Sequence, residues 1–429
     1  MARKMKDSGI EWIGEIPEGW ETINPKALFT QRKDRASKGE RQLTSSQQYG
    51  ILYQDEYMEL TGSKVVTVEK DFDILKHVEA GDFVISMRSF QGGLEYSTKS
   101  GAISSAYVML VPNLELVYPR FYRWLLKSSV YIDALQRTTN MVRDGQAMRY
   151  SNFAQVRLFI LPLDEQKSRA DFLDVKCSNI DKMLSKTRSS IEEYKKLKQA
   201  VITQAVTKGV RGEREMKDSG NPWFGQIPTD WKLSRVGLHF SIILGKMLCN
   251  APLNDTYTLE PYYCAADVHF DGVADGERKK MWFSPIEKDL YRVSVGDLLV
   301  VEGGAGAGGS AIVEKQDSDT YIQNSIMIVR SKGNADNRYL RYLLEFLVKQ
   351  GYIDIVCNKA TIPHFTKDKL SCVPFCLCPT GEQKEIANYL DAKCAEIDKL
   401  IAKKEQLVKE LESYKKSLIY EVVTGKREV

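Results

Sequence analysis

The chain has 429 residues, of which 43% are apolar and 28% charged, and its 61 basic and 57 acidic side chains give a net charge of +4. At roughly 100–200 residues per domain, this length predicts two to four domains. The composition and the lack of any apolar run of ~20 residues exclude a collagen-like, disordered or membrane-spanning chain. The net charge is too small to indicate nucleic-acid binding by itself.

The first residues and the cysteine usage help to predict the cellular compartment of the protein. The opening MARKMKDSG is basic but leads into no apolar stretch, so it does not have the pattern of a secretory signal. The eight cysteines are scattered, and the first of them is Cys177. This usage argues against a disulfide scaffold, and we expect a cytoplasmic protein.

The chain contains an internal repeat of about half its length. Residues 5–20 (MKDSGIEWIGEIPEGW) and 216–231 (MKDSGNPWFGQIPTDW) are identical at ten of sixteen positions. A second match aligns 164–207 with 381–424 without a gap and with seventeen identities in 44 positions. Between these matches the halves diverge, so each half is a variable body followed by a conserved tail.

The bodies have the pattern of mixed α/β domains. Both halves contain short β-type runs, and each run is bounded by turn-forming residues. A helical stretch is predicted in each body, at 119–136 and at 336–355. The β-type runs are 82–87, 107–111 and 156–161 in the first half, and 297–301 and 326–329 in the second.

Each tail carries a heptad pattern of apolar residues over three or more heptads, which is typical of a coiled coil. At 1.5 Å per residue, some 40 residues predict helices on the order of 60 Å long. One amphipathic core helix per domain is the alternative, but such helices average only ~11–12 residues. The residues expected to pack the helices together are Leu173, Ile180, Leu184 and Ile191 in the first tail, and Leu390, Ile397, Ile401 and Val408 in the second.

Three patterns could indicate chemistry, and each has a simpler explanation. Gly304, Gly306 and Gly309 spell G-x-G-x-x-G, but a β-type run follows where a dinucleotide site needs a helix, so we expect a hairpin loop. The E-x-K pairs at 165–167 and 382–384 match only half of a metal-dependent nuclease motif, and their carboxylates suit a helix N-terminus. The cysteines of SCVPFCLCP (371–379) lie in an apolar run, which favours a buried strand over a zinc site.

The rest of the sequence also lacks a catalytic pattern. The four histidines have neither triad nor metal-ligand spacing, and no Walker A motif or N-P-P-Y or D-P-P-Y motif of adenine methylation is present. We therefore expect a protein that is not an enzyme and has no catalytic residues, no cofactor and no metal.

Several loop-like segments mix basic, polar and aromatic residues, which can pair with base edges and phosphates. Two of these segments occupy corresponding places, after the Tyr-Ile-Asp of each half and before its last β-type run. A solvated surface loop is the alternative at each position. The candidate DNA-binding residues are Arg88, Ser89 and Gln91, then Arg143, Gln146 and Arg149, and in the second half Lys359, Thr361, His364 and Lys367.

Three features together resemble the specificity (S) subunits of type I restriction–modification systems. They are the twin openings, the helical segments LPLDEQKSRADFLDVKCSNIDKML and CPTGEQKEIANYLDAKCAEIDKLI, and the endings TQAVTKG and YEVVTGK. The resemblance covers the whole chain, and its specific signal is the repeated opening with the repeated E-Q-K…D-x-K-x-x-x-I-D-K helix.

The resemblance implies an α+β fold with two mixed α/β target-recognition domains, joined by two long antiparallel coiled-coil helices in a pseudo-twofold repeat. We expect the recognition domains at 1–163 and 214–379, and the conserved spacer helices at 164–213 and 380–429. Each domain would read one part of an interrupted, bipartite site in double-stranded DNA. The helices would dock two methyltransferase (modification) subunits and, through them, the endonuclease/translocase (restriction) subunits.

Two other classes of function remain open. A coiled-coil scaffold that binds only proteins would have loops without DNA affinity. An enzyme complete in one chain, a nuclease or a methyltransferase, would show cleavage or methyl transfer by the purified chain alone.

Overall fold

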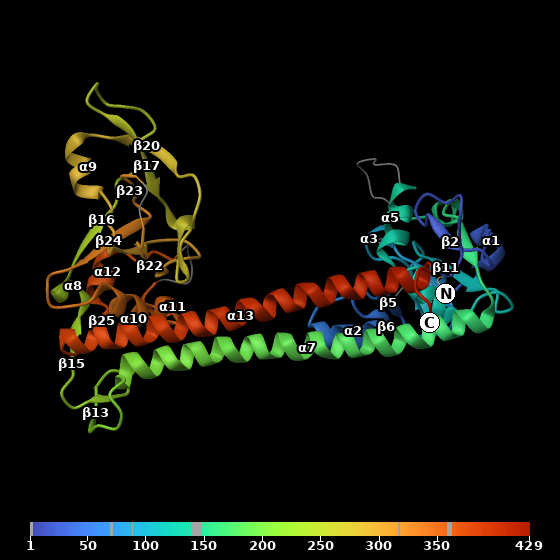
Figure 1. Cartoon of the computed structure of the whole chain (residues 1–429), viewed down its shortest axis with the longest axis horizontal. Helices are drawn as coiled ribbons and strands as arrows, with labels where there is room; N and C mark the ends of the chain where they lie inside the picture. The colour runs from blue at the N-terminus through green and yellow to red at the C-terminus, as the bar shows by residue number, and fades with distance from the viewer. Residues whose placement is uncertain (1–2, 69–71, 88, 139–147, 316–317, 358–362) are drawn as a thin grey trace. The chain divides into compact units, whose positions relative to one another are not determined.

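The computed structural model describes residues 3–68, 72–87, 89–138, 148–315, 318–357 and 363–429. The chain divides into two compact units (Figure 1): unit 1 comprises residues 1–188 and 405–429, and unit 2 comprises residues 189–404. Each unit therefore contains one variable body and the parts of both long helices that contact it. The predicted boundaries follow the repeat instead, with each helix as a segment of its own, and they stay a prediction.

The repeated opening folds into the same antiparallel hairpin in both units. In unit 1, β1 (Met5–Asp7) pairs with β2 (Glu15–Pro17), and in unit 2, β13 (Met216–Asp218) pairs with β14 (Gln226–Pro228). The glycines of the motif, such as Gly9 with φ 66°, supply the left-handed turn conformation that other residues rarely adopt. Each hairpin is followed by a fully buried tryptophan.

The central sheet has the same strand order in both units, which is the structural form of the internal repeat. In unit 1 the order is β4 (Phe29–Arg32), β11 (Val108–Pro112), β8 (Phe83–Ile85) and β9 (Glu95–Tyr96). In unit 2 it is β16 (Phe240–Leu244), β24 (Ile326–Ser331), β21 (Leu298–Val301) and β22 (Ser310–Ile312). All neighbouring strands are antiparallel.

A buried aspartate stabilises the start of one central strand in each unit. Asp82, just before β8, accepts hydrogen bonds from the guanidinium of Arg32 at 2.7 and 3.0 Å. Asp297, just before β21, accepts hydrogen bonds from Arg330 at 2.7 and 2.6 Å. A buried carboxylate needs such a partner, which explains why Gly-Asp recurs in both bodies.

Paired strands also mark where each body begins and ends. In unit 1, β3 (Glu21–Ile23) pairs with β12 (Leu158–Ile160), and in unit 2, β15 (Lys232–Arg235) pairs with β25 (Pro374–Leu377).

The other strands are β5 (Leu43–Ser46), β6 (Gly50–Tyr53), β7 (Lys76–Val78), β10 (Gly101–Ile103), β17 (Thr258–Tyr263), β18 (Val268–His269), β19 (Gly272–Val273), β20 (Lys279–Phe283) and β23 (Tyr321–Ile322).

The bodies contain short helices, and both long helical stretches predicted for them are interrupted. The stretch 119–136 forms α4 (Pro119–Leu125) and α5 (Ser129–Arg137), because the side chain of Ser128 caps α5. The stretch 336–355 forms α10 (Asn337–Lys349) and α11 (Tyr352–Val356), which are separated at a glycine with φ 85°. The others are α1 (Pro25–Leu28), α2 (Gln54–Thr61), α3 (Ser89–Gly92), α6 (Tyr150–Gln155), α8 (Val236–His239), α9 (Pro285–Tyr291) and α12 (Lys367–Cys372), with 3-10 turns η1 (Phe72–Ile74) and η2 (Ala265–Asp267).

The two conserved tails form the long helices α7 (Leu163–Lys208) and α13 (Thr380–Val423). Their ion pairs show an antiparallel arrangement within each unit. In unit 1, Lys415 lies 2.6 Å from Asp181, and in unit 2, Lys198 lies 2.7 Å from Asp398. The predicted α+β fold with long antiparallel helices is therefore confirmed.

The heptad positions predicted to pack the helices are mostly buried. The side chains of Leu173, Ile180, Leu184, Ile191, Leu390 and Ile397 are at most 7% exposed, whereas those of Ile401 and Val408 are partly exposed. Those near the bodies join the body cores, as Leu173 does in unit 1 and Leu390 in unit 2. No helix in the described part of the chain combines the length and hydropathy that crossing a membrane requires.

Candidate nucleic-acid interface

The conserved carboxylates at the helix starts are structural, and they explain why the opening and the tail recur together. In unit 1, Trp20 donates to Glu165 at 3.1 Å, and the guanidinium groups of Arg3 and Arg169 also donate to this carboxylate. Burial by itself would raise the pKa of Glu165, but these hydrogen bonds outweigh it and lower the pKa to about 2.

Unit 2 repeats this arrangement around Glu382, whose side chain has no exposed surface. The indole of Trp231 donates to this carboxylate at 3.2 Å, and Arg214 forms an ion pair with it. The next residue is structural too, because the buried Gln383 donates to the backbone carbonyl of Cys378 at 2.8 Å. The glutamates of the E-x-K pairs therefore hold the opening segment on the helix. The sequence pattern predicts their place at the helix start but not these contacts.

A second conserved acid of each tail fastens the body to the helix. Asp174 accepts a hydrogen bond from the indole of Trp124 on α4 at 2.7 Å. At the matching place in unit 2, Asp391 accepts from the hydroxyl of Tyr342 on α10 at 2.8 Å and from Arg338 at 2.8 Å. The sequence repeat therefore marks contacts that orient each body on its helices.

In unit 2 several loops meet at one edge of the central sheet. Strands β16 and β21 are both antiparallel to β24, so their C-terminal ends lie at the same edge. There the segment 363–365 contacts the loop that follows β21. The amide of Phe365 donates to the carbonyl of Glu302 at 2.6 Å, and that of Gly304 donates to the carbonyl of Pro363 at 3.1 Å.

His364 is the described candidate residue closest to this meeting point. Its side chain is 61% exposed, and its Nδ1 lies 3.3 Å from a carboxylate oxygen of Glu302. The backbone around it is fixed, since its carbonyl accepts from Lys369 at 2.7 Å and from the thiol of Cys357 at 3.2 Å. Lys367 is exposed in the first turn of α12, which Thr366 caps. Both side chains are therefore available to a ligand at this edge.

The glycine-rich run 303–309 forms the hairpin loop between β21 and β22, and not a helix N-terminus. The fold requires glycine at position 308, because its φ is +83° and a Cβ there would lie 2.8 Å from Ile353. Gly306 has neither constraint, because its nearest neighbour would be a Val301 methyl group at 3.8 Å. The loop is thus a compact turn at the same sheet edge as His364.

In unit 1 the corresponding loop joins β8 to β9 and contains α3. Ser89 is only 1% exposed, and its hydroxyl accepts a hydrogen bond from the amide of Ser86 at 2.8 Å. This buried hydroxyl belongs to the turn itself, so we do not retain Ser89 among the residues proposed to contact DNA. Gln91 is exposed, and Arg88 lies outside the described residues.

Hydrogen bonds join the residues that flank each of the two remaining candidate loops. In unit 1, Asn152 donates to the carbonyl of Thr138 at 2.9 Å and accepts from the amide of Arg149 at 3.0 Å. In unit 2, the Cys357–His364 contact joins the corresponding ends. Arg149 is exposed. The candidates Arg143, Gln146, Lys359 and Thr361 lie outside the described residues.

No cluster of three or more potential metal ligands occurs among the residues that the structure describes. The cysteine-rich run 371–379 contains strand β25, in which Cys376 is buried. Burial raises the pKa of this thiol to about 12, so it stays protonated at neutral pH.

Comparison with known proteins agrees with this architecture. Residues 229–410 match the family model of the type I restriction modification DNA specificity domain. The specificity subunit of the MjaVIII type I restriction enzyme of Methanocaldococcus jannaschii is 23% identical over 81% of this chain and 80% of its own length. A protein of the same organism named for the MjaX specificity subunit is 24% identical over 96% of this chain and 95% of its own length.

Two solved structures share the fold. A chain from a study of complex assembly and conformational transition of the type I R-M system superposes with a TM-score of 0.70 at 15% identity, covering 96% of this chain and 99% of that chain. The HsdS subunit of Thermoanaerobacter tengcongensis gives a TM-score of 0.54 at 15% identity, covering 96% of this chain and 98% of that chain.

Two similar bodies, each packed on antiparallel helices, define the fold that this chain shares with these solved structures. The family match and the relatives confirm the resemblance seen in the sequence. By these matches the chain is similar to the specificity subunits of type I restriction–modification systems, through the family model in its second half and through the relatives over most of its length.

Proposed function

We propose that this chain reads an interrupted, bipartite site in double-stranded DNA, with one half-site read by each body. The observation that carries the proposal is the repeated geometry: both units have the same sheet order, and in both a loop of divergent sequence joins the last two strands of that order, β8 to β9 and β21 to β22. Two similar readers on one chain suit a site with two parts, because the arrangement of half-sites mirrors that of the protein.

The residues proposed to contact DNA come from the candidate loops of both units. Among the described residues they are Gln91, Arg149, His364 and Lys367, whose side chains are exposed. The loop residues outside the described part of the chain are proposed on their sequence positions alone, and they are Arg88, Arg143, Gln146, Lys359 and Thr361. Arginine and lysine would bind phosphates and guanine edges, and the amide and hydroxyl side chains would pair with bases.

The long helices are proposed to dock two methyltransferase subunits and, through them, the endonuclease/translocase subunits. Apolar side chains that face away from the helix pair support this role. In unit 1, Val175 is 60% and Met183 50% exposed, and in unit 2, Leu197 is 49% exposed. These side chains offer apolar area that a partner helix would bury. The chain itself would carry no catalytic group, and we expect it to act in the cytoplasm, where the family's DNA substrate lies.

The test combines binding and methyl transfer. The purified chain is titrated with DNA that contains the site found by sequencing the methylated bases of a host with the complete system. Methyl transfer is then measured with the chain alone, with the methyltransferase subunits alone and with both. We expect sequence-specific methylation only from the mixture. Methyl transfer by the chain alone would contradict the proposal.

A protein-binding scaffold without DNA readout is the second candidate, and the exposed apolar side chains on the helices are the observation that favours it. It predicts that the chain assembles with the methyltransferase subunits but leaves their sequence preference unchanged. A changed preference in the assembled complex would exclude it.

A further inference from the structure

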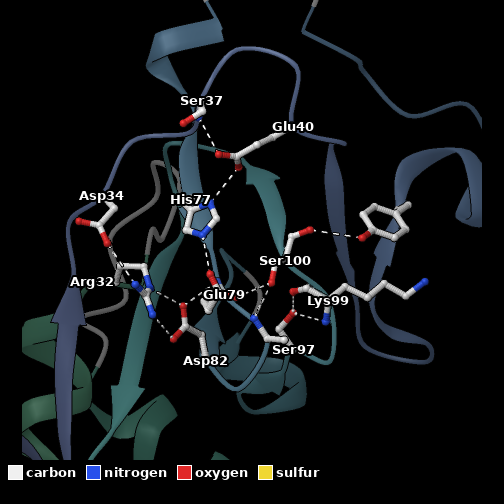
Figure 2. A network of polar contacts seen from close by, with 12 residues as sticks. Arg32, Asp34, Ser37, Glu40, His77, Glu79, Asp82, Ser97, Lys99 and Ser100 are labelled. Atoms are coloured by element: carbon white, nitrogen blue, oxygen red, sulfur yellow. Dashed lines mark hydrogen bonds and ion pairs between the residues drawn. The ribbon is translucent and has the colours of Figure 1, made fainter.

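His77 of unit 1 is bonded to carboxylates through both ring nitrogens. Its Nδ1 lies 2.8 Å from an oxygen of Glu40, and its Nε2 lies 3.0 Å from an oxygen of Glu79 (Figure 2). A neutral imidazole has a single N–H, so it can donate to only one of these acceptors. Both contacts are hydrogen bonds only when the ring is protonated.

The two carboxylates belong to different parts of the body. Glu40 lies in the loop between β4 and β5, where its other oxygen accepts from the amide of Ser37 at 2.8 Å. Glu79 lies in the turn after β7, where its other oxygen accepts from the hydroxyl of Ser100 at 2.7 Å. His77 therefore joins a loop to the strand pair β7–β10.

The loop so joined is basic. Residues 33–41, here called the basic loop, contain Lys33, Arg35, Lys38 and Arg41. Its first half is held by backbone bonds, since the amide of Ala36 donates to the carbonyl of Leu75 at 3.1 Å. Its second half turns back through a bond from the amide of Glu40 to the carbonyl of Ser37 at 3.2 Å. At the end of the loop, the carbonyl of Arg41 accepts from the amide of Ala102 on β10 at 2.9 Å, and its guanidinium pairs with Asp55 at 2.5 Å. Between these points, the turn at 37–40 is attached to β7 through the side chain of His77.

The neighbouring charged groups are engaged elsewhere. The guanidinium of Arg32 on β4 pairs with Asp82 at 2.7 Å and with Asp34 at 3.1 Å, as Figure 2 shows. Lys76 on β7 donates to the carbonyl of Tyr107 at 2.6 Å. The guanidinium of Arg35, opposite Lys76, donates to the carbonyl of Ile74 at 3.0 Å.

Lys99, just before β10, is also engaged away from His77, because its ammonium pairs with Glu56. Within the described residues, every ion pair of Glu40 and Glu79 is with His77. The imidazole is thus the one group here whose charge at neutral pH can change and release these two carboxylates.

We propose that Glu40, His77 and Glu79 form a pH-sensitive clamp that holds the turn at 37–40 of the basic loop on β7 when His77 is protonated and loosens it when His77 loses its proton. After deprotonation, one nitrogen still donates, while the other presents a lone pair to a carboxylate. This property goes beyond the proposed function, since it concerns the order of the loop and not the DNA sequence read.

The direction of the titration follows from the contacts. Partial burial by itself lowers the pKa of His77, but the hydrogen bonds to Glu79 and Glu40 outweigh it, and the net pKa is raised above its usual value. A raised pKa means that the clamp contributes fully below the unfolded pKa of about 6.5 and is lost as the pH rises through the folded pKa.

The test is hydrogen exchange with single-residue resolution on the full chain at about pH 6 and about pH 9, with rates corrected for intrinsic exchange. We expect the amides of Ser37 and Glu40 to exchange on the order of tenfold faster at the higher pH. The amide of Ala36, which is held by a backbone bond, serves as the internal reference. Equal corrected rates at both pH values would overturn the proposal.

Two variants separate the clamp from a general effect of pH. His77→Gln should exchange rapidly at Ser37 and Glu40 at both pH values, because an amide stays neutral. His269→Gln, at an exposed histidine of unit 2, should behave as the unaltered chain does. If His77→Gln does not fold, Glu40→Gln is used and should likewise remove the pH dependence. A pH dependence that persists in the variant that folds would overturn the proposal.

Discussion

At the scale of single residues, burial, hydrogen bonds and close packing all constrain the junction between each opening hairpin and its helix. Trp20 and Trp231 are fully buried, and each donates to a glutamate more than 140 positions away, since the pairs are separated by 145 and 151 residues. A glycine completes each junction. A Cβ at Gly209 would meet Trp231, and one at Gly425 would meet Trp20. The repeated residues are thus explained by packing and hydrogen bonding, and not by chemistry on a substrate.

Replacing Glu165 tests this interpretation. In Glu165→Gln the guanidinium of Arg169, 2% exposed, loses its carboxylate partner. We expect a loss of roughly 2–4 kcal/mol in the free energy of unfolding at pH 7, measured by urea denaturation. Because its pKa is lowered to about 2, Glu165 stabilises the fold above its unfolded pKa, and this contribution disappears as the pH falls through about 2.

The variant should therefore lose less stability on acidification than the unaltered chain. Glu11→Gln is the control, since the side chain of Glu11 is 88% exposed, and its denaturation midpoint should not change. An unchanged midpoint in Glu165→Gln would show that the carboxylate does not stabilise the junction.

The DNA contacts proposed for unit 2 belong to the same scale. His364→Ala and Lys367→Ala should each weaken binding to the recognised site by roughly 1–3 kcal/mol for a base contact and less for a phosphate contact. Neither should lower the melting temperature by much, because both side chains are exposed. Titration of labelled DNA and calorimetry measure the two quantities. His269→Ala is the matched control, and a lower melting temperature with unchanged affinity would mark either residue as structural.

At the scale of elements, the helices show how a heptad pattern becomes a packing surface. Ile180 and Met183 lie less than one turn apart on α7, yet Ile180 is 6% and Met183 50% exposed. The buried residue is part of the core of unit 1, together with Leu418 from α13. The pattern thus indicates which face of α7 contacts α13, and it leaves the opposite face to solvent or a partner.

This contrast gives a paired prediction. Ile180→Ala removes buried methyl groups and should reduce the free energy of unfolding by roughly 2–4 kcal/mol, whereas Met183→Ala should change it by less than about 0.5 kcal/mol. Urea denaturation of both variants measures the difference. Equal effects would mean that the helix pair does not use the face that the heptads define.

At the scale of the whole molecule, the modularity of the bodies has a structural basis. The body of unit 1 leaves β3 and returns at β12, and these strands pair with Ile23 opposite Leu158. The body of unit 2 leaves β15 and returns at β25, with Arg235 opposite Pro374. A segment whose two ends lie side by side can be replaced without moving the helices that follow it.

We therefore expect that exchanging residues 24–157 for the body of another specificity subunit changes one half of the recognised sequence and leaves the other intact. Both paired strands are kept, so the junction with α7 is preserved. The measurement is sequencing of methylated sites in cells that carry the hybrid and its methyltransferase partner. A change in both halves together would contradict independent reading.

The sequence by itself determined the features that depend on neighbours along the chain. Heptad spacing predicted α7 and α13, the repeated opening predicted two equivalent units, and the β-type run after the glycines predicted a hairpin at 303–309. These are local patterns, since a helix or a hairpin is formed by residues a few positions apart. The repeat also carried the family resemblance, which needs no knowledge of contacts.

Only the tertiary structure decided which distant residues meet. The strand register brings His77 to Glu40, and the docking of the opening hairpin brings Trp20 to Glu165. It also buried Ser89, whose residue type had suggested a contact with DNA. Such pairings depend on how strands and helices pack across the fold, and a single sequence contains no periodic signal for them.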